Sequence, residues 1–250
     1  PFKVMEICCE ENSGITKAVE ALGGKGIRCG LFNGCDLNKN AGFNKVVKML
    51  RDEKPDLLWI SLPCGPTSNI QELNMLTPEG FNKVQEKVRK SKRLAARAVH
   101  LMEMQVAEQR DVGQEWPRYN KAWQFKSIQN FWKHVTTYEA AVDGCAYGLR
   151  TDEGLMKKPG RVKCTSKNIW QLQRLCTCEE PHVPCEGGNR TRASALYPKA
   201  MCQQVARIVK KIHEEQEQQV FAAQDSSDND PECLKQFTDQ ELMRVARELM

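Results

Sequence analysis

The sequence lacks a long apolar run, because no stretch of its 250 residues approaches the roughly 18 apolar residues that a membrane-spanning helix needs. The first residues also lack the basic and then apolar pattern of a signal peptide, and the sequence has no internal repeat. These absences exclude a membrane protein and predict no membrane partner. With 40% hydrophobic and 28% charged residues, the composition also excludes a coiled-coil rod and a fully disordered chain.

Twelve cysteines are the unusual feature of what is present. Small secreted scaffolds held by disulfides are shorter and denser in cysteine, so without an export signal we expect reduced thiols and a cytoplasmic or nuclear location. The net charge of +5 is only a weak argument for a nucleic-acid partner, because many proteins carry such a balance. The chain starts at Pro1 and stops at Met250 inside a helical pattern, so we expect a segment of a longer polypeptide.

Charge is distributed unevenly along the chain. Basic residues concentrate in 83–97, whereas the sequence becomes polar and acidic after residue 213. That acidic part has the composition of a flexible linker, followed by a capping box at 238–241 that begins a short helix. We therefore predict a globular domain at 1–213 and, at 214–250, a polar acidic linker with a short C-terminal helix.

Strand and helix patterns alternate within the predicted domain. Continuous apolar runs are typical of strands buried on both faces, and apolar residues at helical spacing indicate amphipathic helices. The expected strands are at 2–8, 27–31 and 56–61, a further short segment is at 111–116, and the expected helices are at 15–22, 42–53, about 81–102 and 197–212. This alternation predicts an α/β fold with a mostly parallel sheet, in which ligands bind at the carboxyl ends of the strands.

Three strand ends carry candidate functional residues. The turn at 6–14 leads into a helix whose first amides could bind a polar or anionic ligand, unless it is a plain turn. Cys64 follows a buried strand in a loop framed by prolines, so it could be a nucleophile whose thiolate is favoured by a helix N-terminus, or a structural thiol. Glu115 could be a general acid with a raised pKa, or a solvated loop carboxylate.

Taken together, these segments resemble the cytosine-C5 DNA methyltransferases over about residues 3–212. The motifs follow one another in the family's order. Residues 6–14 resemble the family's S-adenosylmethionine loop, and residues 34–37 resemble the motif whose Asp contacts adenine. Residues 56–68 resemble the Pro-Cys loop, and Glu115 occupies the place of the Glu in the Glu-Asn-Val motif. Residues 143–149, with Lys158, Arg161 and Lys163, resemble a basic motif, and residues 197–212 resemble the closing helix. The chain also resembles methyltransferase-like segments of dinoflagellate retroelement polyproteins.

The resemblance implies a Rossmann-like fold and transfer of a methyl group from S-adenosylmethionine to cytosine C5 in DNA. It implies Cys64 as the nucleophile, Glu115 at the protonated N3 of the base and Arg161 at a backbone phosphate. The implied cofactor-binding residues are Glu6, Cys8, Ser13, Gly14, Asp36 and Pro63. Because residues 10–12 replace glycines of the family, the alternative is a catalytically decayed nucleic-acid-binding module within a larger polyprotein.

A second candidate site is a small Cys/His-rich insertion at 164–192. Cys176, Cys178, His182 and Cys185 lie within ten residues of one another and match the Cys₃His ligand set of a closed, structural zinc site. Cys164 could replace one of these ligands. The alternative is a surface loop with incidental thiols.

Overall fold

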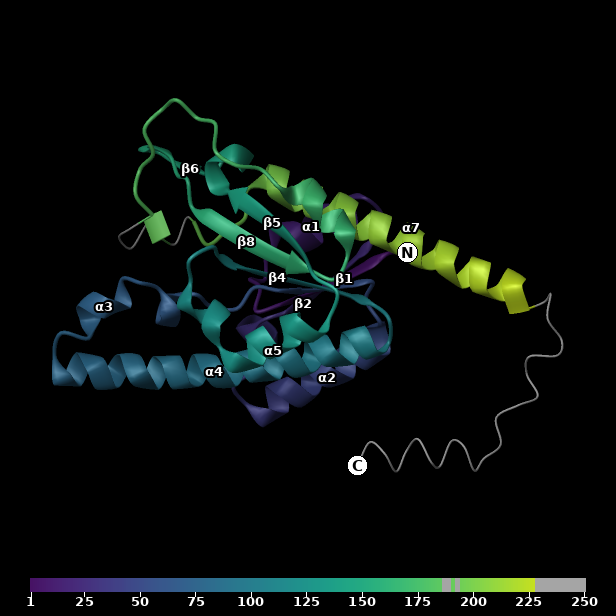
Figure 1. Ribbon diagram of the computed structural model, residues 1–250, viewed down its shortest axis with the longest axis horizontal. Coiled ribbons are helices and arrows are strands. Elements are labelled where there is room, and N and C mark those ends of the chain that lie inside the picture. The colour runs from purple at the N-terminus through teal and green to yellow at the C-terminus, as the bar shows by residue number, and fades with distance from the viewer. Residues whose placement is uncertain (186–189, 192–193, 228–250) are drawn as a thin grey trace. The chain divides into compact units, whose positions relative to one another are not determined.

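The structure of the chain is a computed structural model that describes residues 1–185, 190–191 and 194–227, with side chains described as far as residue 219 (Figure 1). The chain divides into two compact units, residues 1–213 and residues 214–250. The first unit contains the central sheet and every candidate site residue. Of the second unit, residues 214–227 are described, and they are helical.

A six-stranded sheet forms the centre of the first unit. Its strands are β1 (Lys3–Ile7), β2 (Lys25–Cys29), β3 (Leu57–Ile60), β4 (Asp111–Pro117), β5 (Tyr138–Asp143) and β8 (Pro159–Cys164), and a separate ribbon pairs β6 (Arg150–Thr151) with β7 (Gly154–Leu155). The spatial order in the sheet is β2-β1-β3-β4-β8-β5, and only β8 runs antiparallel to its neighbours among these described strands. The predicted α/β class and mostly parallel sheet are therefore confirmed, and the topology is compatible with a Rossmann-like fold.

Helices cover both faces of the sheet (Figure 1). They are α1 (Gly14–Ala21), α2 (Asn40–Glu53), α3 (Gln71–Asn74), α4 (Pro78–Ala107), α5 (Lys126–His134) and α7 (Lys199–Ser227), with short 3₁₀ helices at Leu31–Asn33, Gly65–Thr67, Lys121–Gln124, Gly144–Tyr147 and Lys167–Leu172. One apolar core joins the sheet to α2, α4 and α5, and a second joins it to α1 and to α7 as far as Ile212. Leu58 belongs to the first core and Leu57 to the second, because successive residues of a strand point to opposite faces.

The connections change sides between β1 and β3. Helix α1 leads from β1 to β2 on one face of the sheet, whereas α4 leads from β3 to β4 on the other face. The loops that follow β1 and β3 therefore diverge from each other. Open α/β sheets bind their ligands in the crevice that such a divergence leaves outside the carboxyl ends of the strands.

Local signals in the sequence explain where the main helices begin. The Ser13 side chain caps α1, since its Oγ accepts a hydrogen bond from the Thr16 amide at 3.5 Å. Thr77 caps α4 in the same way, with the Gly80 amide as donor at 3.1 Å, and Pro78 occupies the first helical turn. As a result α4 begins before the predicted 81–102 segment, and it continues beyond it to Ala107.

The closing helix is longer than the sequence predicts. It was expected at 197–212, but α7 runs from Lys199 to Ser227, so the described start of the acidic segment is helix rather than linker. The residues after position 212 are rich in Glu and Gln and contain no Gly or Pro before the end of the helix, and this composition favours helix. The capping box predicted at 238–241 lies outside the described residues. No helix in the described part of the chain is long and apolar enough to cross a membrane.

Candidate active site and metal centre

A cavity of about 300 Å³ lies at the crevice between the β1 and β3 ends. Its walls come from the loops after β1, β2 and β3. They include Cys8, Asp36 and Pro63, three of the residues that the family resemblance assigns to the cofactor. The size is at the lower end of the range of small-molecule sites. The structure therefore brings half of the predicted cofactor-binding residues together around one space that a ligand could enter.

The charge of this cavity is negative. Glu10 and Asp36 are the ionisable carboxylates of its described lining, which contains neither Lys nor Arg. Asp36 is oriented by the Asn38 amide, which donates to its Oδ1 at 2.9 Å, and by the Lys39 ammonium 3.7 Å from Oδ2. The Lys39 ion pair offsets part of the Asp36 charge, and the remaining balance of the described lining favours a cationic ligand over an anionic one.

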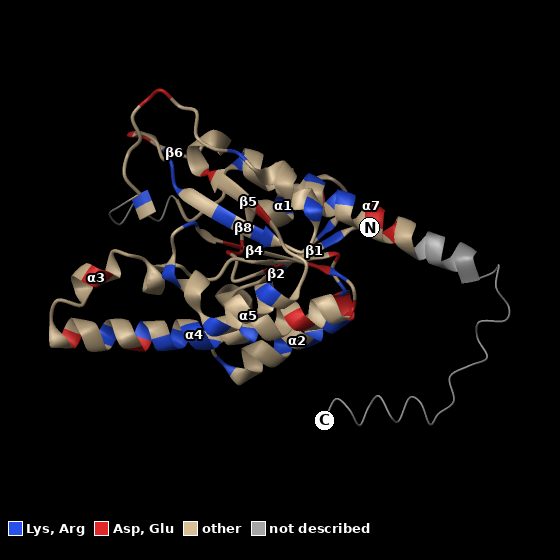
Figure 2. Ribbon diagram, in the orientation of Figure 1, with Lys and Arg blue, Asp and Glu red and all other residues tan. Residues whose placement is uncertain are grey.

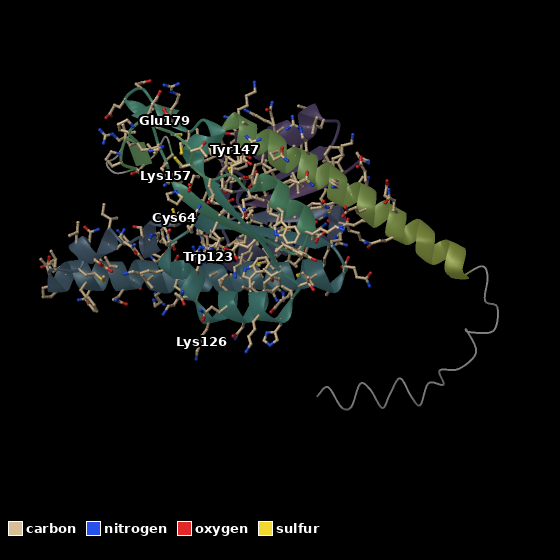
Figure 3. All side chains as sticks on the ribbon, turned by 45° about the horizontal axis from the view of Figure 1, so that its top comes forward. Cys64, Trp123, Lys126, Tyr147, Lys157 and Glu179 are labelled. Carbon is tan, nitrogen blue, oxygen red and sulfur yellow. The ribbon has the colours of Figure 1, made fainter. Side chains whose placement is uncertain are left out.

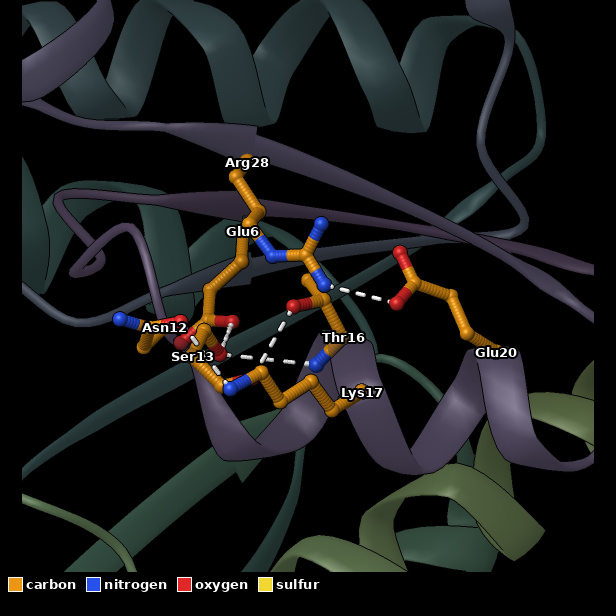
Figure 4. A network of polar contacts seen from close by, with 7 residues as sticks. All are labelled: Glu6, Asn12, Ser13, Thr16, Lys17, Glu20 and Arg28. Carbon is orange, nitrogen blue, oxygen red and sulfur yellow. Dashed lines mark hydrogen bonds and ion pairs between the residues drawn. The ribbon is translucent and has the colours of Figure 1, made fainter.

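Glu6 and Ser13, two further predicted cofactor residues, form a polar network at the start of α1 (Figure 4). The Ser13 hydroxyl donates to the Glu6 carboxylate and accepts from the Thr16 amide at 3.5 Å. Burial raises the pKa of Glu6 to about 7, although the Ser13 hydrogen bond and the Arg28 charge lower it. These two side chains are not among the described walls of the cavity, so the network supports the β1 loop from within.

Gly14, the sixth predicted cofactor residue, lies against the closing helix. A Cβ atom at this position would come within 2.7 Å of the Cys202 Sγ, so glycine permits the close approach of α1 to α7. Gly14 lines a different cavity, between these two helices, and is absent from the described lining of the cavity that holds Asp36. Its role in the structure is therefore packing rather than contact with that cavity.

The Cys64 loop is fixed by hydrogen bonds from the β4 side of the molecule. The Trp116 indole donates to the Leu62 carbonyl at 2.8 Å, and the Asn120 amide donates to the Cys64 carbonyl at 3.0 Å. Thr67 Oγ1 in turn donates to Asn120 Oδ1 at 2.6 Å. Trp116 and Asn120 were not predicted as site residues, and their indole and amide hold the candidate nucleophile in place.

The Cys64 thiol is half-buried at the start of a 3₁₀ helix of only three residues. Burial raises its pKa; the Lys158 charge opposes this and the Glu115 charge adds to it. The expectation that helix amides favour the thiolate is therefore wrong for the free protein, because the helix is short and the desolvation of the sulfur dominates.

Glu115 accepts a hydrogen bond from the Tyr197 hydroxyl at 2.8 Å. The same hydroxyl lies 2.8 Å from Ser61 Oγ, which accepts from the Trp59 indole at 2.9 Å. Since Tyr197 uses its proton for Glu115, the Ser61 hydroxyl donates to Tyr197. Burial raises the pKa of Glu115, while Lys158 and the Tyr197 hydrogen bond lower it, so Glu115 is not the solvated carboxylate of the alternative interpretation.

Lys158 is the cation that acts on both Cys64 and Glu115. It lines a small cavity of about 30 Å³ together with Glu115 and Tyr197. Its ammonium donates a hydrogen bond to the Ser194 carbonyl. The sequence places Lys158 in a basic motif, but nothing in that motif indicates that it lies beside the Cys64 and Glu115 pair.

Arg161, predicted as a catalytic residue, is not brought to this pair. The β4–β8 register sets Arg161 opposite Trp116 and Val162 opposite Glu115, so the Arg161 side chain lies on the other face of the sheet. There its Nε lies 2.9 Å from Glu139 Oε1, and its guanidinium carbon is 5.7 Å from the centroid of Trp123, which Figure 3 labels. A direct role beside Cys64 is therefore not supported.

A separate cluster of soft ligands lies beyond the end of β5. The ligand atoms of Cys145, Cys176, Cys178 and His182 all lie within 4.8 Å of one another, and this Cys₃His group could hold a metal ion. Cys176 Sγ is 3.5 Å from His182 Nε2. In a tetrahedral site with metal–ligand bonds of about 2.3 Å, neighbouring ligand atoms are about 3.8 Å apart, so a small adjustment would close the shell.

The cluster differs from the predicted ligand set in one residue. Cys185 is not part of it, because its thiol donates to Ser194 Oγ at 3.1 Å and acts electrostatically on Cys64. Cys164, named as a substitute, is fully buried at the end of β8. Cys145 takes the fourth place instead. It was missed because it is distant in sequence from the other three ligands and lies in the 143–149 segment, which was interpreted only as part of a basic motif of the family.

Known proteins do not add to these observations, since no family model, curated protein or solved structure matches the chain. The fold and the sites define the class. It is an α/β protein with a mostly parallel sheet, an acidic cavity at the switch in strand order, a Cys–Glu pair on adjacent strand ends and a group that could hold a metal ion.

Proposed function

We propose that the chain transfers a methyl group from S-adenosylmethionine to C5 of cytosine in DNA. The observation that carries this proposal is the position of the loop after β3. Pro63 lines the acidic cavity, and the next residue, Cys64, lies within electrostatic reach of Glu115. A cofactor in the cavity and a cytosine base beside Cys64 would thus both contact this one loop, at neighbouring residues.

The charge of the cavity supports S-adenosylmethionine over other nucleoside cofactors. S-adenosylmethionine carries a positive sulfonium, a positive α-ammonium group and one carboxylate, so its net charge is positive, whereas dinucleotides and nucleoside triphosphates carry several negative charges on their phosphates. Carboxylates from Glu10 and Asp36, without a Lys or Arg in the described lining, suit the former and oppose the latter. When bound, the cofactor supplies an electrophilic methyl group.

The chemistry proposed for this chain begins at the cytosine ring, which must be flipped out of the duplex to be reached. The Cys64 thiol gives up its proton to solvent as its sulfur adds to C6, and Glu115 supplies the proton that N3 takes up. The raised pKa of Glu115 supports this role, because its carboxyl holds a proton to higher pH than an ordinary glutamate does. After C5 accepts the methyl group, solvent takes the C5 proton, the C6–S bond breaks and N3 returns its proton to Glu115, which restores the aromatic ring.

A basic helix could hold the DNA backbone near this site. Figure 2 shows Lys and Arg along α4, which follows the Cys64 loop in the sequence. Lys83, Lys87 and Arg93 are exposed there, whereas Arg89 and Lys90 form ion pairs with Glu86. If Lys83, Lys87 and Arg93 contact phosphates, replacing all three with Gln should lower the slope of log affinity against log salt by about 3.

The test of the proposed function is the formation of 5-methylcytosine. Purified protein is incubated with duplex DNA and S-adenosylmethionine, and the digested nucleosides are analysed by mass spectrometry. We expect product with the natural chain and with Cys202→Ala, a thiol of α7 that is outside the Cys64 loop, but none with Cys64→Ser. DNA binding without product from any chain would favour the decayed binding module instead.

We also propose that the ion held by the Cys₃His group is zinc. Three thiolates and one imidazole form a donor set that zinc accepts in closed structural sites. Elemental analysis of protein purified without chelator should give one zinc per chain. Cys145→Ser should lose the zinc and Cys185→Ser should keep it, whereas the reverse pattern would support the ligand set predicted from the sequence.

A further inference from the structure

We infer that the metal centre holds Lys158 in position and thereby controls the charge beside Cys64 and Glu115. This inference rests on the proposed zinc site and gives the metal a role in the proposed reaction. The Cys₃His group would then act on the candidate active site as well as stabilise its own loop. Four contacts in the described structure connect the two sites.

The first contact starts from the ligand Cys145. Its neighbour Gly144 donates its amide to the Lys157 carbonyl at 2.5 Å and to the Lys158 carbonyl at 3.2 Å. A Cβ atom on Gly144 would lie 3.2 Å from the Lys157 carbonyl oxygen and 2.6 Å from the Leu149 side chain. The close approach of the two segments therefore depends on glycine at this position, directly before a metal ligand.

The second and third contacts pass through Asp143, at the end of β5. Its Oδ2 accepts from the amide of the ligand Cys176 at 2.9 Å, and its Oδ1 accepts from the Arg118 guanidinium at 3.0 Å. In the fourth contact, the Arg118 amide donates to the Pro159 carbonyl at 2.9 Å. Lys158 is thus held on both sides, through Gly144 before it and through Arg118 after it.

The backbone of Lys158 needs such support. Its φ angle is +31°, in a region that residues with a Cβ rarely adopt and that persists only where the surroundings impose it. Lys158 lines the small cavity together with Glu115, and its charge acts on both Glu115 and Cys64. If the metal is removed, the contacts that impose this conformation lose their anchors at Cys145 and Cys176.

The experiment measures how fast iodoacetamide alkylates Cys64 as a function of pH, with the modified peptide quantified by mass spectrometry. Zinc-loaded protein is compared with protein treated with a chelator and with chelated protein given zinc again. We expect chelation to move the Cys64 profile to higher pH by about one unit, which is roughly a tenfold slower reaction below the pKa. Added zinc should restore the profile.

Lys158 variants separate the charge from the metal. Lys158→Met should give the same upward shift while it retains zinc, chelation of that variant should add nothing, and Lys158→Arg should keep the natural profile. Glu115 and Cys185 are the other ionisable groups that act on Cys64, and they are unchanged in these variants.

Two results would overturn the inference. The first is a pH profile of Cys64 alkylation that chelation leaves unchanged although Lys158→Met shifts it. The second is loss of the circular dichroism signal of the whole domain on chelation, because the metal would then be required for folding in general. Because alkylation needs no DNA, absence of DNA methylation with this coupling intact would refute the proposed reaction alone. A chain that binds no zinc would refute the metal proposal and this inference together.

Discussion

The Tyr197 hydroxyl lies 2.8 Å from Glu115 Oε2 and donates a hydrogen bond to it, although the two residues are 82 positions apart in the sequence. Tyr197 stands just before α7, and Glu115 lies near the end of β4. The segment that closes the domain therefore completes the environment of the candidate catalytic carboxyl. Substitutions at position 197 should act on Glu115 without any change in β4 itself.

Tyr197→Phe should raise the pKa of Glu115 further. The Tyr197 hydrogen bond stabilises the ionised carboxylate, so its loss leaves the effect of burial less opposed. The measurement is a titration of the Glu115 side-chain carboxyl carbon by NMR in the natural chain and in the variant. Tyr138→Phe, which alters a tyrosine packed against Trp170, is the control and should leave that titration unchanged. A lower pKa in Tyr197→Phe would contradict the assignment of the hydrogen bond.

Because of Glu6, we expect the free energy of unfolding to fall as the pH rises. Its folded-state pKa of about 7 is above the ordinary value of 4.5, so the folded chain binds the proton more tightly than the unfolded chain does. The stabilisation is therefore fully present below pH 4.5 and is lost as the pH rises through 7, by about 3 kcal/mol in total. Urea unfolding followed by tryptophan fluorescence between pH 5 and pH 8 measures this.

Glu6→Gln isolates this contribution from those of other titrating groups. Glutamine retains an oxygen that can accept from the Ser13 hydroxyl, but it has no proton to lose. The difference in unfolding free energy between the two chains should change with pH in favour of the variant, which should be the more stable chain at pH 8. An equal pH dependence for both chains would show that Glu6 ionises normally.

Asp36→Asn should weaken the binding of S-adenosylmethionine. Asparagine can still accept from the Asn38 amide through its side-chain oxygen, so the turn is retained while the charge is lost. A hydrogen bond to a charged group contributes about 1.5–3 kcal/mol, which corresponds to a roughly 10- to 150-fold weaker affinity. Calorimetric titration measures it, with Asp52→Asn, an exposed residue paired with Lys48, as the control. Equal affinities for both variants would place the cofactor elsewhere.

The parts of the fold that depend on short-range patterns could be predicted from the sequence. The apolar run around Leu57–Ile60 identifies a strand buried on both faces, and the proline-framed loop after it identifies Cys64 as a residue on a fixed backbone. Cys8, Asp36 and Pro63 share a cavity because each follows a strand of the same parallel group. Position at a strand end is thus sufficient to bring residues to one edge of a sheet.

The remaining features depend on register and on contacts between distant segments. β8 lies between β4 and β5 and runs antiparallel to both, which the sequence of this short strand does not indicate. A shift of one residue in its register would exchange the two faces, so the sequence alone does not fix the face of the sheet on which the Arg161 side chain lies. The same connections bring Cys145 to the His182 loop and Lys158 to Glu115, pairs that no local spacing predicts.

The proposed addition of Cys64 to cytosine is tested most directly by covalent trapping. A duplex that contains 5-fluorocytosine should accept the Cys64 sulfur at C6 and the methyl group at C5, but the fluorine cannot then leave as a proton would, so the protein remains attached. With S-adenosylmethionine present, we predict a protein–DNA adduct that survives denaturation, forms with the natural chain and with Cys202→Ala, and is absent with Cys64→Ser. DNA that binds in a salt-dependent way but yields no adduct across a varied pool of duplex and single-stranded targets would contradict catalysis by Cys64.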